Sequence, residues 1–143
     1  MAINTVYTAY ATSTGGRNGH TKTDNGLVSL DLTMPKGMGG LERPGTTTPE
    51  DLFAAGYAAC FGSSVEHAAR VSKTAIQGIE VKAAVSIGRD ETGSYALKVD
   101  LTANIGGVTQ ADAERLVREA DTVCPYSKAV RGNVEVTLKA NAV

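Results

Sequence analysis

The fold is decided by one stretch, TPEDLFAAGYAACFG at residues 48–62. Its beginning carries the signals of a helix N-terminus, because Thr48 is a good N-cap, Pro49 suits the first helical position and Asp51 lies where the acid of a capping box lies. The residues that follow are apolar on every side of a helix, which is typical of a helix buried all round. The sequence therefore predicts a long buried central helix from Pro49 to about Lys73.

Small residues are frequent along this helix and would let another helix approach closely: Ala55, Gly56, Ala59, Gly62 and Ser63. A chain of 143 residues has room for one ordinary core and little material to wrap such a helix completely. We therefore expect a partner subunit to cover part of it.

Strands are predicted on both sides of the central helix. Before it, loose alternation at 4–12 and clear alternation at 27–32 indicate strands. Residues 17–23 lead into Asn25-Gly26, the strongest short hairpin signal, and are predicted to form the strand before that turn. Residues 34–48 are predicted to be a loop, which is long for so small a protein and is therefore expected to be functional or flexible.

After the helix, two alternating strands are followed by a second helix, a short helical turn and a last strand, at 79–89, 95–105, 109–121, 124–130 and 133–140. The order βββ-α-ββ-α-β describes an α+β protein with antiparallel sheets. The length points to a single domain over residues 1–143.

Composition narrows the class of protein. Hydrophobic residues make up 42% and charged residues 20%, which is typical of a globular chain. The formal net charge of −1 gives no electrostatic reason to expect nucleic acid or an anionic membrane surface as a partner. Because no apolar run is long enough to span a bilayer and the N-terminus lacks the layout of a secretory signal, we expect a cytoplasmic protein.

The two cysteines, Cys60 and Cys124, are the main candidates for chemistry. In a reducing compartment a permanent disulfide is unusual. Two thiols are too few to hold zinc alone, and His20 and His67 have no ligand spacing with them. We therefore expect no metal or other cofactor, and either a redox pair or two inert thiols.

A redox role makes demands on other residues. Apolar burial raises the pKa of a thiol, and Cys60, in the middle of its helix, gains nothing from that helix's N-terminus. It would need a cation such as Arg17, from the turn GGRNG at residues 15–19, and Glu50 could orient that arginine. Cys124 precedes a proline at a helix start, where backbone N–H groups favour a thiolate. On local grounds alone, an inert core thiol, a solvated arginine and a glutamate that complements the helix dipole remain open.

Several segments together resemble a known family. They are TPEDLFAAGYAACF at 48–61 and VCPYS at 123–127, with GRNG at 16–19 and residues 32–40 also in agreement. Over nearly its whole length the chain resembles the Ohr, or organic hydroperoxide resistance, branch of the OsmC/Ohr proteins. In having a tyrosine, Tyr126, directly after Cys-Pro, the chain resembles the Ohr branch rather than the OsmC branch.

The resemblance implies an intertwined homodimer with long central helices inside curved sheets. It also implies an antioxidant peroxidase that prefers organic hydroperoxides, including fatty-acid hydroperoxides, to hydrogen peroxide. In this interpretation Cys60 attacks the peroxide, Cys124 resolves the product as a disulfide, and a dihydrolipoyl dithiol reduces that disulfide. Arg17 would hold Cys60 as a thiolate, and Glu50 would hold Arg17.

One expectation follows from spacing. Glu50 and Cys60 are ten residues apart, about 15 Å along a straight helix. For Glu50 to act at a cysteine through Arg17, the helix must be broken or the acid must come from the other subunit, and we expect the second.

The competing interpretations of the whole protein are a non-enzymatic dimeric redox sensor, an OsmC-branch peroxidase of broader specificity and a general disulfide oxidoreductase. The absence of a Cys-x-x-Cys motif weakens the last of these.

Overall fold

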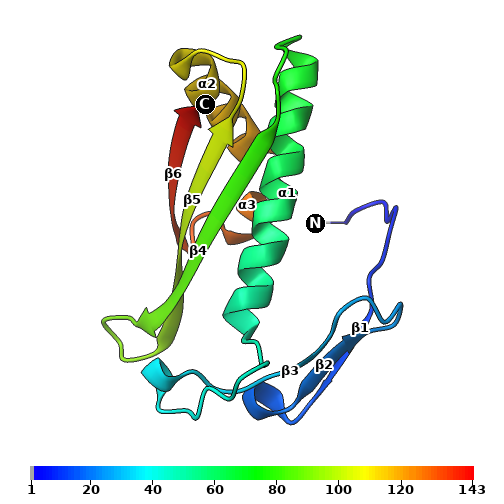
Figure 1. The fold of residues 1–143 in the computed structure, drawn as a ribbon, viewed down its shortest axis with the longest axis vertical. Helices are drawn as coiled ribbons and strands as arrows, with labels where there is room; N and C mark the ends of the chain where they lie inside the picture. Colours follow the sequence, from blue (N-terminus) through cyan, green and yellow to red (C-terminus); the bar gives the residue numbers. More distant parts are fainter. Residues whose placement is uncertain (1) are drawn as a thin grey trace. The chain divides into compact units, whose positions relative to one another are not determined.

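The structure is a computed structural model that describes residues 2–143. By their internal contacts these residues form two compact units, one ending at Leu52 and one beginning at Phe53, and each is described by itself. Figure 1 shows the elements in chain order. The single domain expected over residues 1–143 stays a prediction.

The first unit is built on a small antiparallel sheet in the order β1-β2-β3. Its strands are β1 (Ala11–Thr14), β2 (His20–Thr23) and β3 (Ser29–Asp31), and two 3-10 turns accompany them, η1 (Gly16–Asn18) and η2 (Lys36–Met38). Arg17 lies in η1, between β1 and β2.

The hairpin predicted between β2 and β3 is confirmed. The N–H of Thr23 donates to the carbonyl of Val28 at 2.9 Å, and the side chain of Asn25 accepts from the N–H of Leu27 at 3.0 Å. Gly26 has φ of 73°, the left-handed conformation that this turn requires and that glycine adopts without strain.

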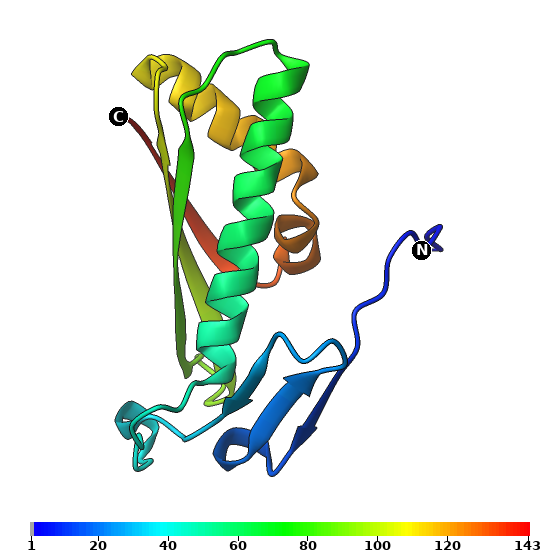
Figure 2. The same cartoon turned by 45° about the vertical axis from the view of Figure 1, so that its right-hand side comes forward.

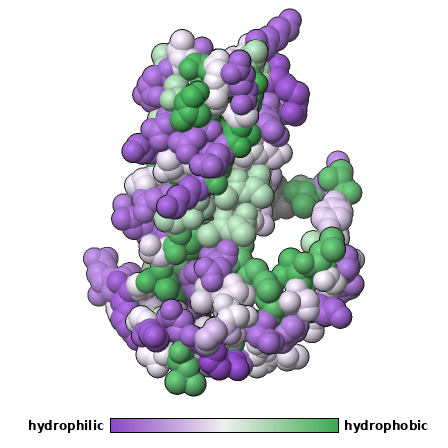
Figure 3. Space-filling view, in the orientation of Figure 1, coloured by the Kyte–Doolittle hydropathy of each residue, from purple (hydrophilic) through white to green (hydrophobic). Residues whose placement is uncertain are grey.

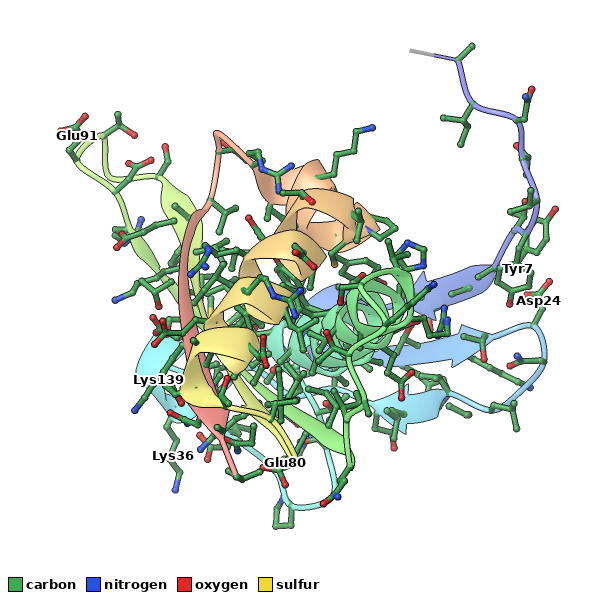
Figure 4. The ribbon with its side chains drawn as sticks, turned by 90° about the horizontal axis from the view of Figure 1, so that it is seen from above. Tyr7, Asp24, Lys36, Glu80, Glu91 and Lys139 are labelled. Carbon is green, nitrogen blue, oxygen red and sulfur yellow. The ribbon has the colours of Figure 1, made fainter. Side chains whose placement is uncertain are left out.

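The strand predicted at 4–12 is wrong over most of its length, because β1 begins only at Ala11. A strand needs a neighbour for its backbone groups. The N–H of Asp24 still donates to the carbonyl of Tyr10 at 3.0 Å, but within the described residues no strand pairs with residues 2–9. The large side chains of this segment are exposed, among them Val6 at 97% and Tyr7 at 77%. Tyr7 marks the segment in Figure 4, and Asp24 marks the turn of the β2–β3 hairpin.

The loop predicted at 34–48 contains the η2 turn, where Lys36 is labelled in Figure 4, and a single parallel β-bridge from Thr47 to Leu32. Its backbone is nevertheless held by side chains. Glu42 accepts from the N–H of Lys36 at 2.8 Å, and Arg43 donates to Thr33 Oγ1 at 3.2 Å.

The central helix is α1 (Pro49–Val71), and it starts at the predicted residue. The N–H of Asp51 donates to Thr48 Oγ1 at 3.1 Å, and the N–H of Thr48 donates to Asp51 Oδ2 at 3.2 Å. This reciprocal pair is the predicted capping box, and it satisfies two N–H groups that a helix start leaves without partners.

The second unit combines the rest of α1 with a three-stranded sheet and two shorter helices. They are β4 (Ile79–Arg89), β5 (Tyr95–Ile105), α2 (Gln110–Val123), α3 (Pro125–Val130) and β6 (Glu135–Ala142). The sheet order is β4-β5-β6, with β4 and β5 antiparallel. The α+β class is therefore confirmed.

One pairing differs from the prediction of antiparallel sheets, because β5 and β6 run parallel, with Val99 opposite Val136. The reason lies in the connection. The chain leaves the end of β5 and returns through α2 and α3 to the edge of the sheet at which β5 begins. From there β6 must run in the same direction as β5.

The helices of this unit lie on one face of the sheet, as Figures 1 and 2 agree. The core is formed between them by Tyr57, Phe61 and Val65 of α1, alternate residues of β5 such as Leu101, and Leu116 of α2. The other face of the sheet is polar, and Glu80 and Lys139, labelled in Figure 4, lie on it, pointing away from the helices.

Helix α1 is buried on one side only within a single chain. Tyr57 and Phe61 are fully buried, whereas Ala55, Ala59 and Ser63 are exposed. Over the middle of α1, Figure 3 shows a weakly hydrophobic surface between hydrophilic regions. The expected cover by a partner subunit stays a prediction. Within residues 2–143, no helix has the length and apolar character that crossing a bilayer requires.

Candidate functional site

Arg17 and Glu50, both predicted from sequence, are in direct contact. The guanidinium donates twice to the carboxylate, from Nη1 to Oε2 at 2.8 Å and from Nη2 to Oε1 at 2.5 Å. The side chains are only 28% and 13% exposed. A two-point, partly buried contact fixes the plane of the guanidinium as a single contact cannot.

The contact changes the acidity of Glu50. The hydrogen bond from Arg17 holds the pKa of this carboxyl below its ordinary value, although burial acts in the opposite direction. Glu50 is therefore a carboxylate at neutral pH, and it balances the charge of an arginine that is largely removed from water.

Cys60 and Cys124, which are 64 positions apart in the chain, are also brought together. Their sulfurs lie 3.6 Å apart, and both are free thiols. Cys60 lies on α1 and is partly exposed, while Cys124, between α2 and α3, is fully buried. Cys60 is therefore the thiol nearer to the surface. The buried sulfur of Cys124 is in van der Waals contact with the sulfur of Cys60.

Within the single chain the environment of Cys60 does not favour a thiolate. Burial is the largest influence and raises the pKa of the Cys60 thiol, and the neighbouring Cys124 raises it further. Cys124 has this effect because a negative charge on one sulfur would make it harder for the adjacent sulfur to ionise. The backbone N–H of Tyr126 acts in the opposite direction and lowers this pKa.

The contribution of Tyr126 was missed by the sequence reasoning. Pro125 predicted a helix start, and the N–H groups of that start were expected to serve Cys124. In the structure the Tyr126 N–H acts on Cys60 instead. The signal was present in Cys-Pro-Tyr, but the direction of that N–H depends on how α3 packs against α1, which a local pattern does not contain.

An aromatic group surrounds this part of α1. The rings of Phe53 and Tyr57 are 6.0 Å apart, and the ring of Tyr126 lies 6.3 Å from the first and 5.8 Å from the second. These edge and tilted contacts are favourable geometries for aromatic pairs. Tyr126 remains 41% exposed, so an apolar surface is present on the chain next to the two thiols.

The spacing between the two pairs can be followed along α1, because Glu50 is in its first turn and Cys60 is ten residues later. The helix is continuous over 23 residues. Of the two options left by the sequence, a broken helix is therefore wrong.

One of the two histidines, His20, lies in the sheet of the first unit. His20 Nδ1 is 2.7 Å from Asp31 Oδ1 and its Nε2 is 3.1 Å from Ser29 Oγ, so it links β2 to β3. Within the described part of the chain, no three potential ligands from His, Cys, Asp and Glu are grouped around a common point.

The Arg17–Glu50 contact predicts a pH-dependent stability. Because the pKa of Glu50 is lower in the folded protein than the value of 4.5 for a free carboxyl, the contact stabilises the fold fully above about pH 4.5 and loses its effect as the pH falls through the folded-state pKa. Glu50→Gln should therefore lower the free energy of unfolding at neutral pH, and the difference from the native chain should shrink on acidification.

Urea unfolding over a series of pH values at one protein concentration measures this difference. Glu66→Gln, at an exposed carboxylate of the same helix, is the matched control. A difference between the native chain and Glu50→Gln that stays constant down to acid pH would contradict the account.

Known proteins resemble this chain over most of its length. Residues 41–139 match the family described as OsmC-like protein. The chain is 42% identical over 135 residues to the organic hydroperoxide resistance protein OhrB of Bacillus subtilis, covering 94% of this chain and 97% of that protein.

Solved structures agree. The structure of an organic hydroperoxide resistance protein from Elizabethkingia anophelis, with crystallant-derived thiocyanate bound, has a TM-score of 0.92 and 46% identity, covering 99% of this chain and 100% of the other. A putative organic hydroperoxide resistance protein from Vibrio cholerae, with captopril bound in one of its active sites, has a TM-score of 0.90 and 44% identity and covers 99% of this chain and 96% of that one. The chain therefore belongs to the OsmC-like protein family and, within it, to the organic hydroperoxide resistance (Ohr) branch.

Proposed function

We propose that the protein is a cysteine-based peroxidase that reduces organic hydroperoxides to alcohols and so protects the cell from oxidative stress. The observation that carries this proposal is the pair of free thiols 3.6 Å apart, with Cys60 partly exposed and Cys124 fully buried. A reachable attacking sulfur with a resolving sulfur in contact is the arrangement that a two-cysteine peroxidase needs. The names of the relatives, organic hydroperoxide resistance proteins, support the substrate class.

The chemistry runs in three steps. The Cys60 thiolate attacks the distal oxygen of the hydroperoxide, an S–O bond forms, the O–O bond breaks, and the departing alkoxide takes a proton and leaves as the alcohol. Cys60 is now a sulfenic acid. Cys124 attacks the Cys60 sulfur, the S–S bond forms, and the hydroxyl leaves as water. An external dithiol then restores both thiols by two exchange reactions and is itself oxidised to a disulfide.

A dithiol of the dihydrolipoyl type suits the third step. Cys124 is buried, so an external thiol can reach the disulfide only at the partly exposed Cys60 sulfur. The mixed disulfide that results must be resolved by a second thiol. A dithiol carries that second thiol in the same molecule, at high effective concentration, whereas a monothiol needs a second encounter. Such chemistry fits the reducing conditions of the cytoplasm, where we place the protein.

The preference for organic substrates is supported by the aromatic group around Phe53, Tyr57 and Tyr126. Apolar surface near the attacking sulfur gives an alkyl or aryl tail something to bury, while hydrogen peroxide has no such tail. Binding energy from the tail can then position the O–O bond against Cys60.

Activation of Cys60 is assigned to the Arg17–Glu50 pair. Burial raises the pKa of the thiol, so the reaction at neutral pH needs a cation, and an arginine held by a carboxylate keeps its charge in a partly buried place. In a continuous α1, Glu50 and Cys60 of the same chain are about 15 Å apart along the axis. We therefore assign the pair to the thiols of the second subunit of a homodimer.

The homodimer itself is supported by two exposed features of the single chain. The outward side of α1 carries small residues, including Ala55, Ala59 and Ser63, which permit close approach of another subunit. The segment before β1 exposes large apolar side chains such as Val6 and Tyr7, which a folded protein seldom leaves in water.

The peroxidase proposal predicts the result of a single turnover. Adding one equivalent of tert-butyl hydroperoxide to the reduced protein should remove both free thiols and lower the intact mass by that of two hydrogen atoms, because the Cys60–Cys124 disulfide forms. Thiol counting and intact-mass measurement check this, with Cys124→Ser as the control that should stop at an oxidised Cys60. Unchanged thiols would exclude the peroxidase.

With a dithiol reductant, cumene hydroperoxide should be consumed faster than hydrogen peroxide, and equal rates would contradict the role of the aromatic group.

The shared site predicts complementation between two inactive chains. A purified mixed dimer of a Cys60→Ser chain and a Glu50→Ala chain contains one complete site if Glu50 serves the partner's thiol. It should recover about half the native activity per dimer, while each variant homodimer stays inactive. A mixed dimer as inactive as the two homodimers would place the pair and the thiol in the same chain.

A further inference from the structure

The ring of Tyr126 lies against α1 at a position where that helix has no side chain. A Cβ atom added to Gly56 would stand 3.1 Å from Tyr126 Oη and 3.3 Å from its Cε2 atom. Such distances are shorter than ordinary van der Waals contact between carbon atoms. The sequence predicted that small residues of α1 let another helix approach, and at Gly56 the helix that approaches is α3 of the same chain.

A second contact fixes the same turn of α3 to the same turn of α1. The hydroxyl groups of Tyr57 and Ser127 are 2.7 Å apart in a fully buried hydrogen bond. Consecutive residues of α1, Gly56 and Tyr57, thus meet consecutive residues of α3, Tyr126 and Ser127. The position of α3 on α1 is therefore set at two adjacent points, one by packing and one by a hydrogen bond.

This docking determines the surroundings of the Cys60 sulfur. The backbone of α3 carries the Tyr126 N–H, and the residue before α3 is Cys124, whose sulfur is 3.6 Å from that of Cys60. Cys60 lies one helical turn after Gly56 on α1. A shift of α3 away from Gly56 would move both the N–H and the resolving sulfur away from Cys60.

The other glycine of α1 has no such role. A Cβ atom at Gly62 would meet only Val81 Cγ2 at 3.6 Å, an ordinary contact. Both glycines lie inside the helix, and neither has the left-handed backbone that would require glycine. Alanine favours a helix interior over glycine to the same extent at either position. The two positions therefore differ only in what the new methyl group touches.

We propose that Gly56 is a positioning residue of the thiol site: by leaving room for the ring of Tyr126, it holds α3 so that the Tyr126 N–H and the Cys124 thiol both face Cys60. The inference deepens the proposed peroxidase function, on which its catalytic meaning rests. The positioning of α3 by Gly56 can be tested on the reactivity of the Cys60 thiol alone, without any peroxide.

The test compares Gly56→Ala with Gly62→Ala in a Cys124→Ser background, where Cys60 is the one thiol left. The rate of Cys60 alkylation by iodoacetamide is followed from about pH 6 to about pH 10, which gives the pKa of the thiol and the reactivity of its thiolate. Size-exclusion chromatography establishes that the compared proteins have the same assembly state.

Gly56→Ala should raise the pKa of Cys60 and slow alkylation at neutral pH about threefold or more, because the Tyr126 N–H is displaced from the sulfur. Gly62→Ala should alkylate like the parent. Adding Tyr126→Phe to Gly56→Ala removes the atom nearest the new methyl group and should restore part of the lost rate. Equal alkylation profiles for the two glycine variants would overturn the proposal.

The positioning role of Gly56 can still be tested if Gly56→Ala does not fold. If Gly56→Ala loses its helical circular dichroism, Tyr126→Ala replaces it, because that variant removes the docked ring and leaves α1 unchanged. Slow alkylation then supports the positioning role, and a native profile overturns it. Failure of the native protein to consume peroxide, with the alkylation order intact, would refute the proposed function alone.

Discussion

A thiolate in the middle of an apolar helix is unfavourable, because the charge loses its hydration and the helix's own N-terminus is too far away to help. Cys60 is in this situation, and within the single chain the pKa of its thiol is raised by burial and by the neighbouring Cys124. The same burial gives apolar substrates a surface near the sulfur. In the proposed mechanism, the rest of the site serves to ionise a sulfur that is partly buried.

Two devices act against the cost of that charge. One is the Tyr126 N–H, which lowers the pKa of Cys60 and depends on how α3 docks on Gly56 and Tyr57. The other, in the proposed mechanism, is the Arg17–Glu50 pair of the second subunit, whose two-point contact keeps the guanidinium charged and fixed. A single backbone N–H does not outweigh the burial, since the net direction of the pKa shift is upward. We therefore assign the larger part of the activation to the arginine pair.

The features that could be predicted from sequence are those with local causes. Thr48 and Asp51 specify the start of α1 by bonding to each other's backbone, and Asn25-Gly26 specifies the hairpin turn. The features that could not be predicted depend on distant parts of the chain. Alternation at residues 4–12 indicated a strand, but a strand needs a neighbour and β1 begins only at Ala11. The Arg17–Glu50 pairing was inferred from chemical need, whereas the direction of the Tyr126 N–H depends on helix packing.

In the proposed mechanism the Arg17–Glu50 pair makes Cys60 a thiolate at neutral pH. The most direct measurement is the ultraviolet absorbance of the thiolate as a function of pH, in the assembled Cys124→Ser protein with and without Arg17→Ala. We expect the pKa of Cys60 to lie below the ordinary thiol value with Arg17 present and above it after the substitution. A pKa of Cys60 that is above the ordinary value in both proteins, and unaffected by Arg17→Ala, would contradict it.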